Sequence, residues 1–330
     1  MTTPTDTALL PARFRTELRT DVTRGLTASP KRLPPRWLYD PLGSQLFEQI
    51  TQLPEYPYTR AERAILTQCG PAVAALTGAR TVIELGSGSS EKTRILLDAL
   101  GEHHTRLTYA PVDVSASALA QAVAALRADY PRLTTVPLVA DFTTGLALPT
   151  LPGPRLLIFL GGTFGNLLSG ERAVFLRSLR SRLDPGDRLL IGVGLVKDPD
   201  RIRAAYDDAA GVTAAFNLNV LTMLNRELQA DFDLSAFEHV ALWDAANDWI
   251  EMRLRSRREQ TVVLHGLGLH VSFAHGEDLR TEISAKFRPR RLAEEMSQAG
   301  LQVSHWFTDP DQLYGLALVA RDDEPAPPAR

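Results

Sequence analysis

The sequence predicts an α/β protein built on a doubly wound, Rossmann-like parallel sheet, with an α+β segment inserted after the fifth strand. Three observations predict this class. From Thr81 onward, short β-branched or leucine-rich runs alternate with longer helical patterns, which is typical of parallel strands covered on both faces. The first of these runs ends in a glycine-rich turn at Gly86–Gly88. Beyond Val240 the pattern changes to the polar–apolar alternation of antiparallel strands.

Length and composition describe an ordinary globular protein. The chain has 330 residues, of which 44% are hydrophobic and 23% charged, and its formal net charge is -3. At roughly 150 residues per domain this is one large or two ordinary domains. No apolar run approaches the roughly 18 residues that a membrane span needs, and the mild acidity offers no basic stripe for nucleic acid. We therefore expect a small-molecule partner, and neither a membrane nor a nucleic acid.

Three further features bear on location and partners. The first residues lack a basic segment followed by an apolar one, so the sequence predicts cytoplasmic residence. The single cysteine, Cys69, is expected to be a small buried apolar residue. The seven histidines show no metal-ligand spacing. Once the predicted helices and strands are assigned, no long amphipathic stripe remains that would require a second copy of the chain. We therefore expect no metal and a monomer.

The N-terminal part is predicted to be helical. An apolar helical pattern at residues 14–22 precedes a proline-rich break at residues 29–35, and a second one at residues 46–50 follows Gly43. Thr59–Glu62 has the spacing of a capping box ahead of an apolar run, so a third helix is expected to begin there.

The central part alternates strands and helices. The predicted strands are 81–85, 107–112, 135–140, 156–160 and 188–195, and the predicted helices are 91–100, 115–130, 170–183 and one after Pro199. Antiparallel strands at 249–255 and 267–273 follow, and 279–287 can extend the same sheet. A helix at 291–299 and closing strands at 302–307 and 313–320 are expected to return to the large sheet. Residues 1–10 and the tail 322–330 are expected to fray or be disordered.

The glycine-rich turn indicates a ligand site. A strand runs into Gly86 and Gly88, which permit close approach of a ligand, and a helix with free N–H groups follows. Glu91 stands where a dinucleotide fold needs its third glycine, and a carboxylate there would repel a pyrophosphate. The Gly-Lys-Ser/Thr ending of a Walker A loop is also missing. These features disfavour phosphate ligands.

Acidic residues end three successive strands. Glu84 suits a ligand that carries an ammonium group, Asp113 suits ribose hydroxyls, and Asp141 suits an adenine amino group. S-adenosylmethionine (SAM) offers these three features and no phosphate. The alternative is that Asp113 and Asp141 are only helix caps or turn residues.

The fourth strand ends in a second glycine-rich loop. Asn166 lies in this loop and can both donate and accept hydrogen bonds, which suits an amino-acid head group. Methyl transfer requires chiefly that a neutral nucleophile be aligned with the methyl group and that water be excluded. A turn-stabilising asparagine is the alternative.

The chain resembles the histidine-specific methyltransferases of the ergothioneine pathway, which are class I enzymes that trimethylate the α-amine of L-histidine to hercynine. The resemblance extends from about Leu18 to Val319. Its motifs are Leu53–Tyr56, Glu84–Gly88, Ser90–Arg94, Gly165–Leu167, Ala205–Thr213 and Glu282–Arg288. The chain departs from the family at Pro57, which follows Tyr56, and at Gly162, where serine is common.

The resemblance implies roles for individual residues. The residues that it implies for SAM are Gly86, Ser87, Gly88, Lys92, Asp113, Asp141 and Phe142. Those that it implies for the substrate are Tyr56, Asn166, Tyr206 and Thr213 for the amino-acid part, Glu282 and Ser284 on the imidazole, and Met252 lining the ring pocket. Tyr39, Asn166 and Gly161 are the implied catalytic set, with Tyr39 and Gly161 close to the amine. Tyr39 is the first candidate to take the amine proton, as a tyrosinate-like group, unless a water-mediated acceptor does so.

The order of the predicted strands and helices also indicates a domain division. Residues 1–61 would form an N-terminal helical segment, residues 62–198 and 286–321 the class I methyltransferase domain, and residues 199–285 an inserted substrate-binding domain.

Three alternatives to a histidine methyltransferase remain open: a methyltransferase for another aromatic amino acid, a non-catalytic SAM-binding module, and a redox Rossmann enzyme. Glu91 argues against the last of these.

Overall fold

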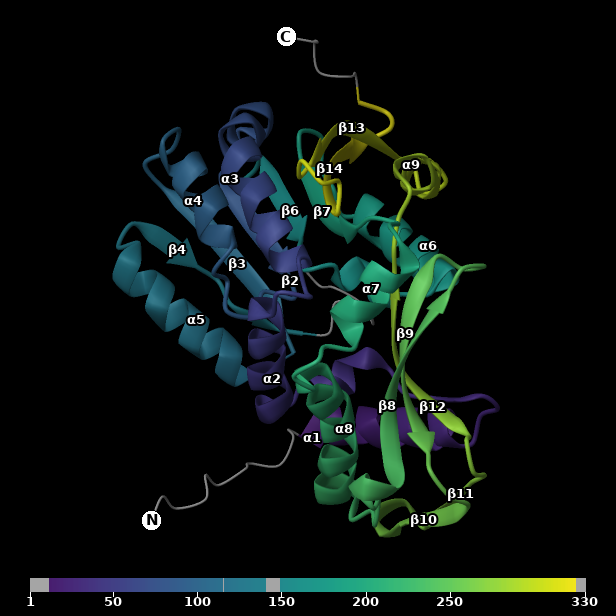
Figure 1. The fold of residues 1–330 in the computed structure, drawn as a ribbon. Coiled ribbons are helices and arrows are strands. Elements are labelled where there is room, and N and C mark those ends of the chain that lie inside the picture. Colours follow the sequence, from purple (N-terminus) through teal and green to yellow (C-terminus); the bar gives the residue numbers. More distant parts are fainter. Residues whose placement is uncertain (1–11, 115, 141–148, 325–330) are drawn as a thin grey trace. The chain divides into compact units, whose positions relative to one another are not determined.

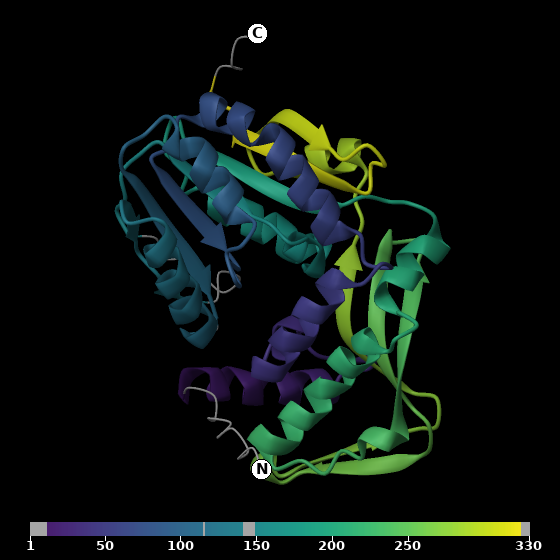
Figure 2. The same cartoon turned by 60° about the vertical axis from the view of Figure 1, so that its left-hand side comes forward.

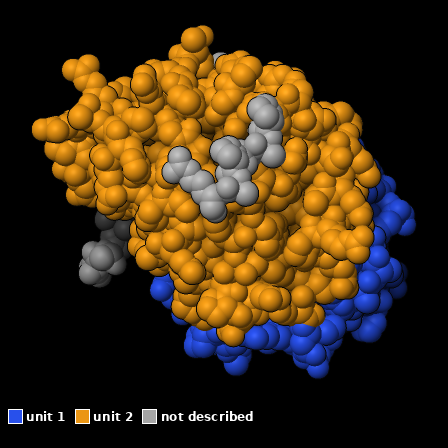
Figure 3. Space-filling model, turned by 90° about the horizontal axis from the view of Figure 1, so that it is seen from above, with its two compact units in different colours: residues 1–56, 198–283 blue, residues 57–197, 284–330 orange. Residues whose placement is uncertain are grey.

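The computed structural model describes residues 12–114, 116–140 and 149–324. The chain forms two compact units, residues 1–56 with 198–283 (unit 1) and residues 57–197 with 284–330 (unit 2), which Figure 3 distinguishes by colour. The N-terminal segment up to Tyr56 thus groups with the segment that the sequence identifies as an insertion. Within the described ranges, no helix is long and apolar enough to cross a membrane.

Unit 2 contains the large sheet, whose strand order is β13-β14-β7-β6-β2-β3-β4, with β5 also paired to β3 (Figure 1). Its strands are β2 (Thr81–Leu85), β3 (Leu107–Asp113), β4 (Leu133–Thr135), β5 (Leu138–Val139), β6 (Arg155–Phe159), β7 (Arg188–Gly194), β13 (Leu301–Thr308) and β14 (Tyr314–Arg321). β2 to β7 pair in parallel, whereas β14 runs antiparallel to β7 and to β13. This topology confirms the predicted doubly wound sheet. The strand predicted at 135–140 is split around Pro137, which has no N–H for a ladder hydrogen bond.

Helices cover both faces of this sheet (Figure 2). All five residues of β2 and all five of β6 are buried, which requires cover on both faces. The helices of unit 2 are α3 (Tyr58–Thr77), α4 (Thr93–Gly101), α5 (Ala116–Asp129), η2 (Thr163–Asn166), α6 (Ser169–Arg180) and α9 (Pro289–Ser297).

Two expectations for unit 2 are corrected. The capping box at Thr59–Glu62 does not form, because α3 begins at Tyr58 without a side-chain cap and the carboxylate of Glu62 bonds elsewhere. Residues 322–324, expected in a disordered tail, are placed next to β14. Glu324 accepts a hydrogen bond of 2.7 Å from Arg188, which anchors them.

Unit 1 consists of helices around a smaller sheet. Its helices are α1 (Ala12–Leu26), η1 (Pro35–Leu38), α2 (Pro41–Gln52), α7 (Pro199–Tyr206), α8 (Val212–Leu228), η3 (Leu234–Ala236) and η4 (His265–Leu267). The sheet has the order β1-β12-β9-β8, where β1 is Lys31–Arg32, β12 is Asp278–Ala285, β9 is Trp249–Ser256 and β8 is Phe237–Asp244. β11 (Leu269–Phe273) was expected in that sheet but pairs with β10 (Gln260–Leu264) in a separate two-stranded sheet.

The short strand β1 explains why the N-terminal segment belongs to unit 1. Lys31 and Arg32 pair in parallel with Leu279 and Arg280 of β12, and the N–H of Leu33 donates to the Arg280 carbonyl at 2.8 Å. The backbone hydrogen bonds of the N-terminal segment are therefore completed by a strand almost 250 positions later in the sequence.

Candidate functional site

The glycine-rich turn of unit 2 is tied to the end of β3. Gly86 has φ 73° and Gly88 has φ 49°, a region that only glycine adopts readily. The N–H of Gly86 donates to the Val112 carbonyl at 2.8 Å, and the N–H of Gly88 donates to Oδ2 of Asp113 at 3.0 Å. The turn and Asp113, which the sequence assigned to one ligand, therefore lie side by side.

The turn has the features of a site for a polar ligand. The Ser87 side-chain oxygen is buried and has no hydrogen-bond partner among the described residues. Leaving a buried hydroxyl unsatisfied costs free energy, so a ligand group that bonds to it is favoured. Together with the Asp113 carboxylate and the exposed backbone of Gly88, this set fits a hydroxyl-rich ligand such as the ribose of SAM. Asp141 and Phe142, which were predicted to bind the adenine, lie outside the described residues.

The carboxylate of Glu84 is engaged by donors of the protein itself, which argues against the expectation that it meets an ammonium group. It is buried, and its two carboxylate oxygens accept hydrogen bonds from the hydroxyls of Thr93 and Tyr109. Tyr109 also contacts Ser90 at 2.7 Å. Burial raises the pKa of Glu84 to about 7, against the lowering effect of the two hydroxyl donors. Glu84 therefore holds the turn onto the start of α4.

Lys92 and Gly161 share a partner that sequence reasoning did not assign to the site. The Lys92 ammonium pairs with the carboxylate of Glu62, which also accepts the N–H of Gly161 at 2.9 Å. Gly161 and Gly162 have φ values of 78° and 76°, a left-handed backbone conformation that glycine adopts without strain. No local pattern in the sequence indicates this role of Glu62, because its partners lie 30 and 99 positions away along the chain.

Asn166 is half-buried at the end of η2, in the loop that follows β6. The preceding residue brings this loop against Ala285, the last residue of β12, which belongs to unit 2 as the loop does. A Cβ on Gly165 would lie 2.8 Å from the carbonyl oxygen of Ala285. A side chain at this position would push the loop away from the strand. The close approach places Asn166 one residue from the backbone contact with β12.

Ser284 has a charged partner. The Lys286 ammonium donates to Oγ of Ser284 at 2.9 Å and lies 4.5 Å from the centroid of the Tyr58 ring. Both Ser284 and Lys286 are buried. Because an ammonium can only donate, the Ser284 oxygen must accept in this bond, and its own proton is directed to another acceptor.

Three of the predicted site residues of unit 1, Tyr39, Tyr56 and Tyr206, meet in an aromatic cluster. The ring of Tyr39 lies 5.4 Å from both Phe47 and Phe216, and the ring of Tyr56 lies 6.3 Å from Phe47 and 6.1 Å from Tyr206. All four pairs are edge-to-face. Phe47 and Phe216 carry no sequence signal beyond helical periodicity, and the structure adds them to the candidate site.

Tyr39 is held in this cluster as a neutral phenol. Burial, followed by the nearby Glu282 and Tyr56, raises the pKa of Tyr39 well above 10. A raised pKa contradicts the expectation that Tyr39 accepts the amine proton as a tyrosinate-like group. The neighbouring Asp40 anchors the backbone here, since its carboxylate accepts hydrogen bonds from Gly43 N–H at 2.8 Å and Asn219 at 2.7 Å.

A buried polar network connects Tyr206 with β9 and β12. His239 donates through Nε2 to the Tyr206 carbonyl at 2.8 Å and accepts at Nδ1 from Asn217 at 2.9 Å. Asn217 in turn accepts from the Thr281 hydroxyl, which is 3.0 Å from the Met252 carbonyl. Burial lowers the pKa of His239, which favours the neutral ring that this pattern requires. The network fixes the backbone on both sides of the predicted ring pocket.

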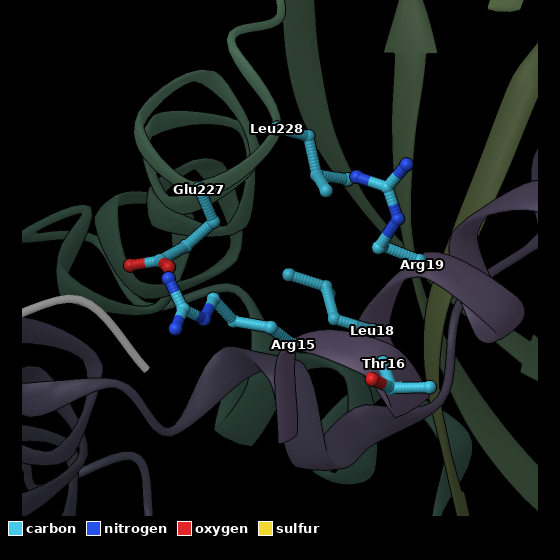
Figure 4. Close-up of a pocket in the computed structure, with 6 residues that line it drawn as sticks. All are labelled: Arg15, Thr16, Leu18, Arg19, Glu227 and Leu228. Carbon is cyan, nitrogen blue, oxygen red and sulfur yellow. The ribbon is translucent and has the colours of Figure 1, made fainter. Parts of the chain in front are cut away.

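Met252 and Glu282 are buried on neighbouring strands, and Thr213 is buried in the first turn of α8. The Thr213 N–H donates to Asp208 at 2.7 Å. Burial alone would raise the pKa of Asp208, but the hydrogen bonds from Thr213 and Val212 outweigh it and hold the pKa below its ordinary value. A pocket of about 360 Å³ lies elsewhere in unit 1 and contains none of the predicted residues (Figure 4). It is bounded by Arg15, Thr16, Leu18, Arg19, Glu227 and Leu228.

Comparison with known proteins identifies the class. The profile of a family described as "Histidine-specific methyltransferase, SAM-dependent" matches residues 18–321. The Histidine N-alpha-methyltransferase of Mycolicibacterium smegmatis is 52% identical over 304 residues, 92% of this chain and 95% of that protein. The corresponding enzyme of Mycobacterium tuberculosis is 48% identical over the same shares. The L-tryptophan methyltransferase of Psilocybe serbica is 26% identical over 92% of this chain and 93% of that protein.

The sheet described above is thus that of a class I SAM-dependent methyltransferase. More particularly, the chain belongs to the family of SAM-dependent histidine-specific methyltransferases.

Proposed function

We propose that the protein transfers three methyl groups from SAM to the α-amine of L-histidine and so forms hercynine, the first step of ergothioneine biosynthesis. The observation that carries the proposal is the meeting of Tyr39, Tyr56 and Tyr206 in one aromatic cluster with Glu282 near Tyr39. Membership of the histidine-specific family over residues 18–321 supports it.

Recognition of the imidazole is assigned to two residues of β12. The Glu282 carboxylate can only accept, so it selects a ring N–H. The Ser284 hydroxyl, whose oxygen is already occupied by Lys286, donates its proton and so suits the other ring nitrogen. An analogue that lacks either ring nitrogen would leave a buried polar group unsatisfied, at a cost of about 1–3 kcal/mol.

Binding of the methyl donor is assigned to unit 2. Gly86, Ser87, Gly88 and Asp113 would hold its ribose side, and Lys92 would hold its amino-acid carboxylate. SAM supplies a methyl group on a sulfonium, which an uncharged amine displaces in line. The protein therefore has to orient the amine and exclude water, and Asn166 and the Gly161 loop are assigned to this task.

Proton removal is assigned to water, with Tyr39 as a hydrogen-bonding phenol. The raised pKa keeps Tyr39 a neutral phenol at neutral pH. Its oxygen can accept a hydrogen bond from the amine and its O–H can donate one to water, so the proton of the ammonium goes to water and the phenol keeps its own. The aromatic faces of Tyr39, Phe47 and Phe216 suit the cationic methylated amine, with about 0.5–2 kcal/mol from cation–π attraction.

The test is mass spectrometry of the twenty amino acids incubated with the purified protein and SAM. We expect histidine alone to gain three methyl masses. Methylation of another amino acid instead would refute the assignment of Glu282 and Ser284 to imidazole and favour the alternative of another aromatic substrate. No product, with SAM shown to bind, would favour a non-catalytic SAM-binding module.

The monomeric state and cytoplasmic residence stay predictions of the sequence. Sedimentation velocity of the purified protein and fractionation of the source cells would measure them directly.

A further inference from the structure

The carboxylate of Glu62, on α3, joins three other elements of unit 2. Glu62 is 1% exposed. Its Oε1 accepts hydrogen bonds from the N–H of Gly161 and the hydroxyl of Tyr314, each at 2.9 Å. Its Oε2 accepts from the Lys92 ammonium and, at 3.1 Å, from the same Gly161 N–H. The donors belong to the turn before α4, the loop after β6, and β14, and together they satisfy a carboxylate that would otherwise be costly to bury.

The surrounding backbone is shaped around this carboxylate. A Cβ on Gly192 of β7 would lie 2.4 Å from Oε1 of Glu62 and 2.6 Å from the Tyr314 hydroxyl, so only glycine leaves room for the pair. A Cβ on Gly161 would lie 3.8 Å from the Lys92 nitrogen, which puts the loop after β6 directly against the ammonium. The side chain of Lys92 is 19% exposed, and an ammonium has three N–H donors. Lys92 can therefore bond to Glu62 and to an anionic ligand at the same time.

We propose that Glu62 is a positioning residue for the methyl donor. It holds the Lys92 ammonium in place for the donor's amino-acid carboxylate and fixes the Gly161 amide beside it. The inference rests on the proposed function for the identity of the donor. Without Glu62 the long Lys92 side chain would have to be ordered by the ligand itself, which reduces affinity. If Glu62 were only a neighbouring negative charge, its removal would instead strengthen the binding of a carboxylate.

The experiment is isothermal titration calorimetry with two ligands, S-adenosylhomocysteine and 5′-methylthioadenosine, which lacks the amino-acid part. We expect Glu62→Gln to weaken binding of S-adenosylhomocysteine at least tenfold and to change binding of methylthioadenosine by less than twofold. We expect Lys92→Met to show the same pattern, and the double variant to bind S-adenosylhomocysteine no more weakly than Lys92→Met alone. The matched control is Glu91→Gln, a carboxylate of the same turn that is paired with Arg63 at the surface at 2.9 Å, and it should change neither affinity.

Three results would overturn the inference: unchanged or stronger binding of S-adenosylhomocysteine by Glu62→Gln, equal losses for both ligands, or additive losses in the double variant. If Glu62→Gln does not fold, Glu62→Asp decides by the same comparison, because its shorter side chain keeps the charge but cannot reach all three donors. A wild-type protein that binds S-adenosylhomocysteine but methylates no histidine would refute the proposed function and leave this test intact.

Discussion

Glu84 makes the stability of the protein depend on pH in a way that the structure quantifies. Its pKa is about 7 in the folded state, compared with an ordinary value of 4.5 for the unfolded chain. The folded state therefore holds a proton that the unfolded chain releases, so this contribution to stability is complete below pH 4.5 and is lost as the pH rises through 7. At 1.36 kcal/mol per pKa unit, the free energy of unfolding falls by about 2 kcal/mol between pH 5.5 and pH 8 from this group alone.

The perturbation that isolates this contribution is Glu84→Gln, which keeps the shape of the side chain and cannot ionise. Urea unfolding followed by tryptophan fluorescence at pH 5.5 and pH 8 gives the free energy of unfolding of both proteins. Because all other groups titrate alike in both, we expect the wild-type value minus the variant value to fall by about 2 kcal/mol between the two pH values. The control Tyr109→Phe keeps the carboxyl group of Glu84. Its free energy of unfolding minus that of Glu84→Gln should therefore also fall between pH 5.5 and pH 8. A difference that does not change with pH would refute the reasoning.

Three further predictions concern the site. Tyr39→Phe should lower kcat for histidine about tenfold or more without moving the pH profile, since the hydroxyl is protonated throughout; full activity at every pH would exclude a role for it. Glu282→Gln should raise the Kd for histidine by roughly 5- to 150-fold, the equivalent of about 1–3 kcal/mol, and leave S-adenosylhomocysteine affinity unchanged in calorimetry. Gly165→Ala should lower the free energy of unfolding by about 1–3 kcal/mol, because its Cβ would lie 2.8 Å from the Ala285 carbonyl oxygen. Gly170→Ala, whose Cβ meets nothing within 4 Å, is the matched control, and an equal loss there would contradict the clash.

The large sheet could be predicted because its strands are buried on both faces and therefore read as continuous apolar runs, as β2 and β6 do. Two strands of unit 1, β8 and β1, could not. β8 was missed because half-exposed residues interrupt its alternation, and β1 is two basic residues whose only strand signal is the pairing with β12. Such a strand exists because of a tertiary contact, which no local pattern records.

The same distinction applies to the site. The glycine turn and Asp113 could be predicted because a turn and a strand end are local features. Glu62 was assigned to a capping box from the spacing of its neighbours, whereas its actual donors lie 30, 99 and 252 positions away in the sequence. The protonation of Tyr39 was misjudged for a related reason, since burial among Phe47 and Phe216 depends on how α2 and α8 pack.

A neutral Tyr39 has a consequence for successive methylation under the proposed function. Each methyl group removes an N–H donor from the amine, and the third leaves a fixed positive charge. A tyrosinate facing that charge in a buried site would hold the product strongly, because charge pairs are worth far more where water is excluded. Aromatic faces such as those of Tyr39, Phe47 and Phe216 contribute only about 0.5–2 kcal/mol to holding a cation. The burial that prevents Tyr39 from acting as a base therefore also allows the site to retain the partly methylated amine and still release the trimethylated product.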